Sequence, residues 1–230
     1  MTKVAVLQSS YIPWKGYFDI IHDVDHFIFY DDVSYTKNDW RNRNKIKTEA
    51  GAAWITIPAG NNKGKLIHEV RLENTAWQAK HWRTISQTYA KAPYFDTYKQ
   101  GLEEIYLETD WASLSDLNQH VTRLIAREWL DIQTEFSDSR AFTLQGQKQD
   151  RLLDLLKQAG ARTYVSGPAA QAYIDPADFQ EAGIELIWKD YTGYPEYPQA
   201  HPPFEHGVSV LDLLFQTGPD AADYIWGWRS

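Results

Sequence analysis

The stretch LQSSYIPWKGYFDIIHDVDHFIFYDD, Leu7–Asp32, decides the expected fold. A short apolar run, Val4–Gln8, leads into it, and a second, His26–Tyr30, closes it. Between them, apolar residues of Lys15–Val24 recur at helical spacing, so the order strand, helix, strand is predicted. A parallel pair of strands needs such a crossover.

The residues that follow the two strands are therefore expected at one rim of a parallel sheet, where ligands of open α/β sheets bind. The first rim segment holds Tyr11 and Trp14, and the second begins with Asp31 and Asp32. Tyr and Trp suit clefts that hold flat or sugar-like ligands, although packing in the core explains aromatic residues as well. We expect the aromatic turn to form one wall of a pocket.

The rest of the chain continues the pattern. We expect a single α/β domain over residues 1–230, with a Rossmann-like, nucleotidylyltransferase-like, mostly parallel sheet, flanking helices and a mainly helical middle around residues 75–130. Further strands are predicted at Ala53–Pro58, Ile67–Leu72, Thr163–Val165 and Ile184–Trp188, and further helices at Thr75–Tyr89, Asp116–Leu130, Gln149–Gln158 and Ser209–Phe215.

The composition argues against several classes of function. A net charge of -8 and a pI near 5.3 argue against a broad nucleic-acid-binding surface. The chain has no cysteine, so it can use no thiolate nucleophile or Cys-ligated zinc. No apolar run approaches the roughly 18 residues of a membrane span, and the N-terminus does not read as a signal peptide. A cytoplasmic location is expected.

Three motifs could carry chemistry. The sequence P-x-x-G at Pro13–Gly16 stands between a predicted strand and a predicted helix. This order resembles the phosphate-binding turn of nucleotidylyltransferases, but a turn that serves only packing explains it too. Arg41 and Arg43, two apart in KNDWRNRNK, suit a carboxylate or diphosphate, or else a solvated hairpin. His22–His26 has zinc-like spacing, but it spans the end of a helix, so no metal site is expected.

Several long blocks recur in the order typical of one family. They are QSSYIPWKGYFDII, FIFYDDVSYTKNDWRNRNKIKT, WITIP, AWQAKHWRTISQTYAKAPYF, YVSGPAAQAYID and PFEHGVSVLDLLFQTG. From about Val4 to Gly218, the chain resembles WbqC-like family proteins. One departure is that family members often read HQP where this chain has Leu7-Gln8-Ser9, so a histidine and a proline are missing at the rim.

The resemblance implies a role in the biosynthesis of surface polysaccharides, such as O-antigen, or of small molecules. It places pocket residues at the positions that match the family blocks. These are Tyr11, Trp14, Gly16, Asp31, Asp32, Lys37, Arg41, Arg43, Asn44, His81, Ser166, Gly167 and Tyr173. We expect Ser9, at the same rim, to bind substrate as well.

We expect a transferase that forms an amide on an amino sugar or amino acid, from a thioester or aminoacyl ester donor. His81 or Asp32 would be the base, and Arg41 and Arg43 would anchor a donor phosphate. The partners would be small-molecule substrates, a nucleotide sugar among them, and an acyl-carrier or aminoacyl donor. The sequence names no cofactor. The alternatives are magnesium-dependent nucleotidyl transfer, with Asp31 and Asp32 at the metal, and a non-catalytic protein that binds a nucleotide sugar or carrier.

Overall fold

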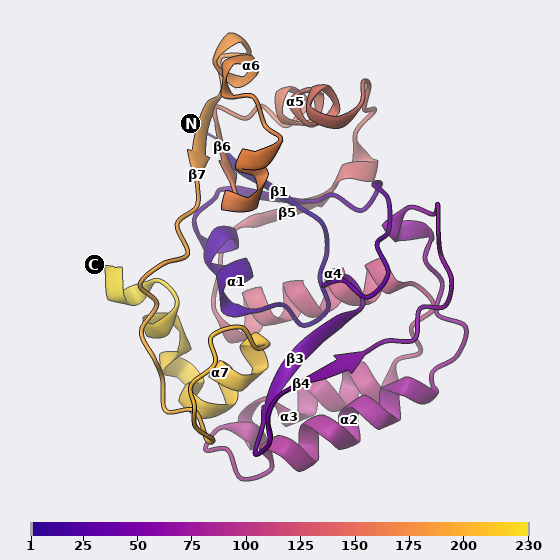
Figure 1. Ribbon diagram of the computed structural model, residues 1–230, viewed down its shortest axis with the longest axis vertical. Coiled ribbons are helices and arrows are strands. Elements are labelled where there is room, and N and C mark those ends of the chain that lie inside the picture. Colours follow the sequence, from indigo (N-terminus) through magenta and orange to yellow (C-terminus); the bar gives the residue numbers. More distant parts are fainter. Residues whose placement is uncertain (1, 230) are drawn as a thin grey trace.

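A computed structural model describes residues 2–229, and its centre is a five-stranded parallel sheet with the strand order β5-β2-β1-β6-β7. Its strands are β1 Lys3–Leu7, β2 His26–Phe29, β5 Glu135–Asp138, β6 Thr163–Ser166 and β7 Glu185–Trp188. Helices α5 and α6 lie on one side of the sheet, and α1 and α4 lie on the other (Figure 1). The expected α/β architecture with a mostly parallel sheet and flanking helices is confirmed.

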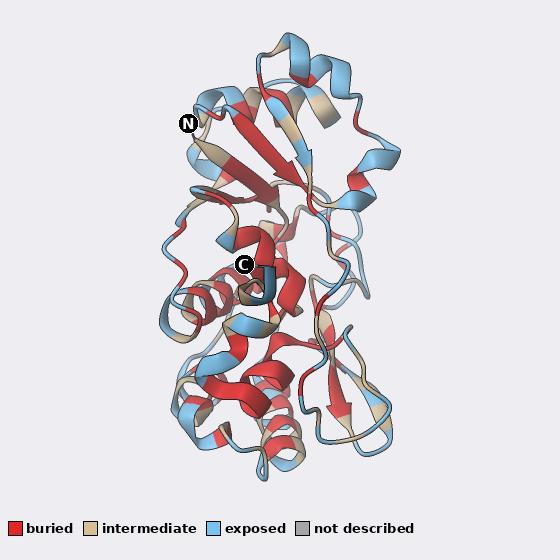
Figure 2. Cartoon of the chain, turned by 90° about the vertical axis from the view of Figure 1, so that its left-hand side faces the viewer, coloured by how far each residue is buried: buried red, intermediate tan, exposed pale blue. Residues whose placement is uncertain are grey.

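The alternation of side chains along β1 divides the interior into two cores. Val4 and Val6 point to the side of α5 and pack in a cluster with Leu155 and Leu156, whereas Ala5 packs in the cluster that includes Phe18 of α1. Burial on both faces explains why β1 reads as a continuous apolar run. Figure 2 shows the buried residues concentrated in the sheet strands of the upper half and in helices of the lower half.

The α-helices of the described residues are α1 Lys15–His22, α2 Ala76–Tyr89, α3 Phe95–Glu103, α4 Leu114–Leu124, α5 Lys148–Gln158, α6 Pro176–Glu181 and α7 Val210–Thr217. A π-helical turn prolongs α3 over Glu104–Glu108, and another prolongs α4 over Ile125–Trp129. Within residues 2–229, no helix is both long and apolar enough to cross a membrane.

A separate antiparallel hairpin, β3 Arg43–Thr48 and β4 Gly51–Thr56, lies beside α2 and α7 (Figure 1). The strand expected at Ile67–Leu72 is wrong: the segment holds a 3-10 turn, Ile67–Glu69. Ile67 and Val70, three apart, are both buried, and this spacing belongs to a turn of helix.

The strand order places the site. From β1 the chain moves to β2 and β5 on one side, and then returns to β6 and β7 on the other. Because all five strands are parallel, the segments after Leu7, Phe29 and Asp138 emerge at one edge, with α4 beneath β2 and β5. We call this edge of the sheet the carboxyl edge.

Candidate functional site

A buried carboxylate organises the carboxyl edge. Asp31, which follows β2, is fully buried, and its Oδ1 accepts a hydrogen bond from the Ser9 backbone N–H at 2.8 Å. Its Oδ2 accepts from Ser115 Oγ at 2.5 Å and from Gln119 Nε2 at 3.1 Å. The carboxylate therefore joins the end of β1 to the first turns of α4, as the predicted adjacency of the two rim segments requires.

Gln119 extends this network toward the edge strand β5. Its Nε2 also donates to Asp138 Oδ2 at 2.6 Å, and its Oε1 accepts from Arg123 Nη1 at 3.0 Å. One amide thus contacts two carboxylates and one guanidinium, which fixes its orientation, because only the NH₂ group can face the carboxylates. The network holds Arg123 in place from the side of α4.

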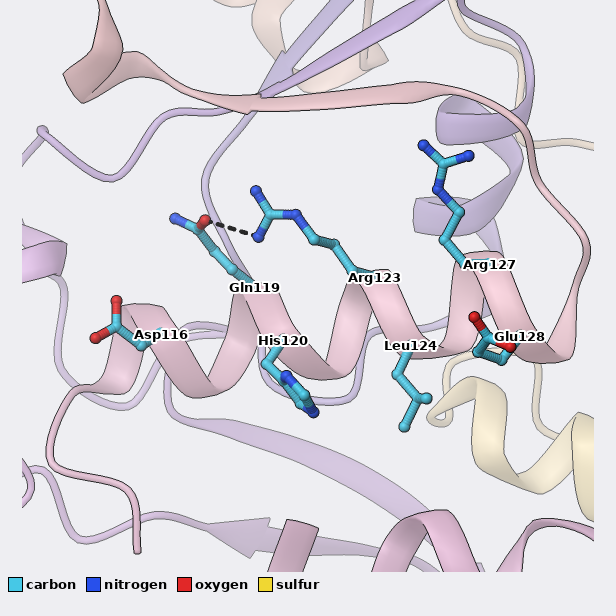
Figure 3. A pocket seen from close by; sticks show the side chains of 7 residues that line it. All are labelled: Asp116, Gln119, His120, Arg123, Leu124, Arg127 and Glu128. Carbon is cyan, nitrogen blue, oxygen red and sulfur yellow. Dashed lines mark hydrogen bonds between the residues drawn. The ribbon is translucent and has the colours of Figure 1, made fainter. Parts of the chain in front are cut away.

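Helix α4 and its π-helical extension line an open hollow of about 420 Å³. Figure 3 shows Gln119, Arg123 and Arg127 on one flank of the helix, with His120, Leu124 and Glu128 on the other and Asp116 near the start. All of these residues come from one helix and its π-helical extension, so α4 sets the spacing of the polar groups.

Aromatic rings support both arginines of the hollow. The guanidinium carbon of Arg123 lies 4.7 Å from the centre of the Phe29 ring, and that of Arg127 lies 5.4 Å from the centre of Phe136. Arg127 Nη2 donates to Thr134 O at 2.6 Å. A guanidinium has five N–H groups, and among the described residues Arg123 donates only to Gln119. Donors therefore remain for an anion.

A histidine lines the same hollow. The His120 ring lies 5.1 Å from the Trp111 ring, measured between centroids, and the side chain is exposed. Partial burial, and then the positive charge of Arg123, lower the pKa of His120 below its usual 6.5. The imidazole is therefore neutral at pH 7 and can accept a proton.

A second guanidinium reaches this edge from the segment before the hairpin. Arg41 donates through Nη1 to Gln8 Oε1, and the Tyr17 hydroxyl donates to Gln8 O at 2.9 Å. Burial and the charge of Asp31 raise the pKa of Tyr17 well above its usual value, while Arg41 and Arg123 act in the opposite direction. Arg41 and Arg123, far apart in the sequence, therefore both act on the Tyr17 hydroxyl.

Two of the predicted site residues are deep in the interior. Tyr11 is fully buried, and its hydroxyl contacts His81 Nδ1 at 2.8 Å and Tyr106 OH at 2.5 Å. His81 Nε2 contacts Thr56 O at 3.2 Å, and burial lowers the pKa of His81 to about 4. Both ring nitrogens are thus occupied within the protein, so the geometry favours a structural role for this pair.

Asp32 faces different partners from its neighbour Asp31. Its Oδ1 accepts from Ser139 Oγ at 2.5 Å, and its Oδ2 pairs with Arg151. The two carboxylates thus have separate donor sets, and Asp32 is engaged in an ion pair. This arrangement does not favour Asp32 as a free base or the two aspartates as a shared metal site.

The predicted residues of KNDWRNRNK separate as well. Arg43 lies over Trp54, with its guanidinium carbon 4.1 Å from the ring centre, and does not share the Gln8 contact of Arg41. Asn44 Nδ2 donates to Tyr11 O at 3.1 Å and to Ile12 O at 2.8 Å. Asn44 therefore stabilises the aromatic turn, in which Ile12 has φ of +37°. Lys37 is exposed.

The other predicted residues lie around β6 and the start of α1. The Trp14 ring covers Gly16, and its centre is 5.2 Å from that of Tyr191. Ser166 is buried at the end of β6, Gly167 follows it, and Tyr173 is 74% exposed. The structure places these residues apart from the polar hollow on α4.

None of the seven residues that line the hollow was predicted as a site residue, including the four that the site depends on, Gln119, His120, Arg123 and Arg127. In the sequence they are the polar positions of an amphipathic helix, and a solvated face is the ordinary explanation for such positions. The available signal was the position of this helix, which immediately precedes a parallel strand and so begins at the carboxyl edge.

Comparison with protein-family models identifies one family for this chain. The WbqC-like protein family model matches residues 8–224. The chain is also similar to a protein of Mycobacterium tuberculosis described as "Uncharacterized protein Rv1507c", with 46% identity over 228 residues, 98% of this chain and 98% of that protein. No solved structure was found to match. The chain belongs to the WbqC-like protein family.

Proposed function

We propose that the chain is a transferase of surface-polysaccharide or small-molecule biosynthesis. It joins an acyl or aminoacyl group, taken from a thioester or ester donor, to the amine of an amino sugar or amino acid. The observation that carries the proposal is the hollow on α4, where two arginines and a neutral histidine line one open space. The resemblance to WbqC-like proteins supports the pathway in this proposal.

The arginines would hold the anionic part of a substrate. Arg123 and Arg127 lie four residues apart on one helix, and Phe29 and Phe136 support their planes. A guanidinium on an aromatic face keeps its in-plane donors for a phosphate or carboxylate. A hollow of about 420 Å³ has room for such a group and part of the molecule that carries it.

His120 would serve as the base, in place of His81 and Asp32. The amine nitrogen attacks the thioester carbonyl and loses a proton to the neutral imidazole. The new C–N bond forms, the C–S bond of a thioester or the C–O bond of an ester breaks, and the leaving thiolate or alkoxide takes the proton from the imidazolium. This route needs no enzyme nucleophile, which suits a chain without cysteine.

The alternatives receive less support from the geometry. Magnesium-dependent nucleotidyl transfer would use Asp31 and Asp32 together, but each has its own donors within the chain. A non-catalytic binding protein would use the same arginines without needing His120. Measuring which reaction the protein turns over, if any, distinguishes acyl transfer, nucleotidyl transfer and binding alone.

The test measures thiol release from acyl-coenzyme A thioesters in the presence and absence of amino sugars. A thiol-trapping dye reports only the released thiol, because the chain has no cysteine. We expect release that depends on the acceptor. His120→Gln should lower kcat on the order of 10²-fold or more, and Arg123→Gln should raise KM more than it lowers kcat.

Arg83→Gln, a change at an exposed arginine of α2, is the control and should leave both constants unchanged. Pyrophosphate release from a nucleoside triphosphate with magnesium would instead indicate nucleotidyl transfer. Ligand binding without turnover for any donor and acceptor would contradict the transferase proposal.

A further inference from the structure

Two tryptophans stand out, one on the hairpin and one in the turn before it. Trp40 is 42% exposed and Trp54 is 43% exposed, and their ring centroids are 5.3 Å apart. Exposed tryptophans in mutual contact make an apolar patch, and such patches mark interaction sites more often than isolated exposed residues do. Nothing in the transfer mechanism uses this pair.

Cations accompany the two rings. Arg43 lies 4.1 Å from the centre of Trp54, and Lys45, directly opposite Trp54 in the ladder, has its Nζ 5.4 Å from the same centre. A cross-strand cation–π pair stabilises a hairpin, and this accounts for Trp54. It does not account for Trp40, which belongs to the turn before β3.

The position of Trp40 is fixed by its backbone. Trp40 O accepts from Tyr11 N at 2.9 Å, and Trp40 N donates to Asp39 Oδ1 at 2.7 Å. The indole is therefore presented at the surface by a turn that is tied to the rim of the sheet. We call Trp40, Trp54, Arg43 and Lys45 the hairpin platform.

We propose that the hairpin platform binds a nucleoside diphosphate, free or carrying a sugar, with the base against Trp40 and the phosphates at Arg43 and Lys45. Aromatic rings beside cations are what a base and its phosphates require, since every base has a face that stacks and guanidinium matches diphosphate oxygens. The chain carries a net charge of -8, so these cations form a local site and not part of a broad basic surface. The inference does not depend on the transfer reaction.

The experiment titrates uridine diphosphate, uridine and inorganic pyrophosphate into the whole protein by calorimetry. We expect uridine diphosphate to bind more tightly than uridine or pyrophosphate. Trp40→Ala should weaken it on the order of 5- to 100-fold, and Arg43→Gln should weaken both uridine diphosphate and pyrophosphate. Trp228→Ala, a change at another exposed tryptophan, is the matched control and should have no effect.

The Trp40 side chain is exposed, so a melting curve should show that its replacement leaves the fold intact. Equal affinity of Trp40→Ala and the unaltered protein for uridine diphosphate would overturn the proposal. Absence of binding to the unaltered protein would do so too. If affinity depends on Arg123 and not on Trp40, the platform is excluded while the proposed hollow on α4 stands.

Discussion

At the scale of single residues, His81 shows how burial decides chemistry. Its two nitrogens contact Tyr11 and Thr56 O, and burial lowers its pKa to about 4. The folded chain therefore holds this imidazole neutral, while the unfolded chain protonates it near pH 6.5. Because the unfolded state binds the proton first, His81 makes the fold less stable as the pH falls from 6.5 toward 4.

The loss of stability with falling pH can be measured. Between pH 7 and pH 5 the His81 contribution should reduce the free energy of unfolding by about 2 kcal/mol. His81→Gln should be less stable at pH 7, but its stability should fall less over the same range, as measured by urea unfolding. The same change at His201, in the loop before α7, should leave the slope in place. An unchanged slope in His81→Gln would show that His81 is protonated in the folded chain.

At the scale of elements, the turn into α1 depends on Gly16. A Cβ at this position would lie 2.3 Å from a carbon of the Trp14 ring, so the ring would have to leave its contact with Tyr191. Gly16→Ala should therefore lower the free energy of unfolding by about 1–3 kcal/mol, although alanine favours helices. Thermal and urea unfolding measure this.

Gly167→Ala is the matched control. The nearest atom to a Cβ there, Tyr191 Oη, is 3.9 Å away, and Gly167 has φ of -67°. The change should alter stability by less than about 0.5 kcal/mol. Equal effects of the two substitutions would mean that the Trp14 ring does not constrain the turn.

The elements also show what could be predicted. The core strand β1 and helix α1 follow from their apolar residues, because β1 is buried on both faces and every residue of α1 except His22 is buried. The edge strand β5, with the sequence EFSD, and β3, with RNKIKT, carry polar residues, so periodicity does not reveal them. Asp31 was predicted as a site residue because it follows a strand. Arg123 was not, because its place at the site depends on which side of α4 faces β2, and the tertiary structure decides that.

At the scale of the whole molecule, the parallel sheet brings distant segments to one edge. Ser9 after β1 donates to Asp31 after β2, and Gln119 of α4 joins Asp31 to Asp138 at the end of β5. The same helix carries Arg123, Arg127 and His120 along the hollow. Strand order and one crossover helix therefore create a polar site that no continuous motif encodes.

The most direct test of the central claim is a titration of inorganic pyrophosphate into three proteins that all carry Trp40→Ala and Arg43→Gln, which remove the hairpin platform. The first has no further change, the second adds Arg123→Gln, and the third adds Arg83→Gln. If the hollow on α4 holds the anionic part of a substrate, pyrophosphate should bind the first and third proteins alike and bind Arg123→Gln on the order of 10-fold more weakly, the loss of a charge-assisted hydrogen bond. Equal binding to all three, or no binding to any of them, would contradict the account.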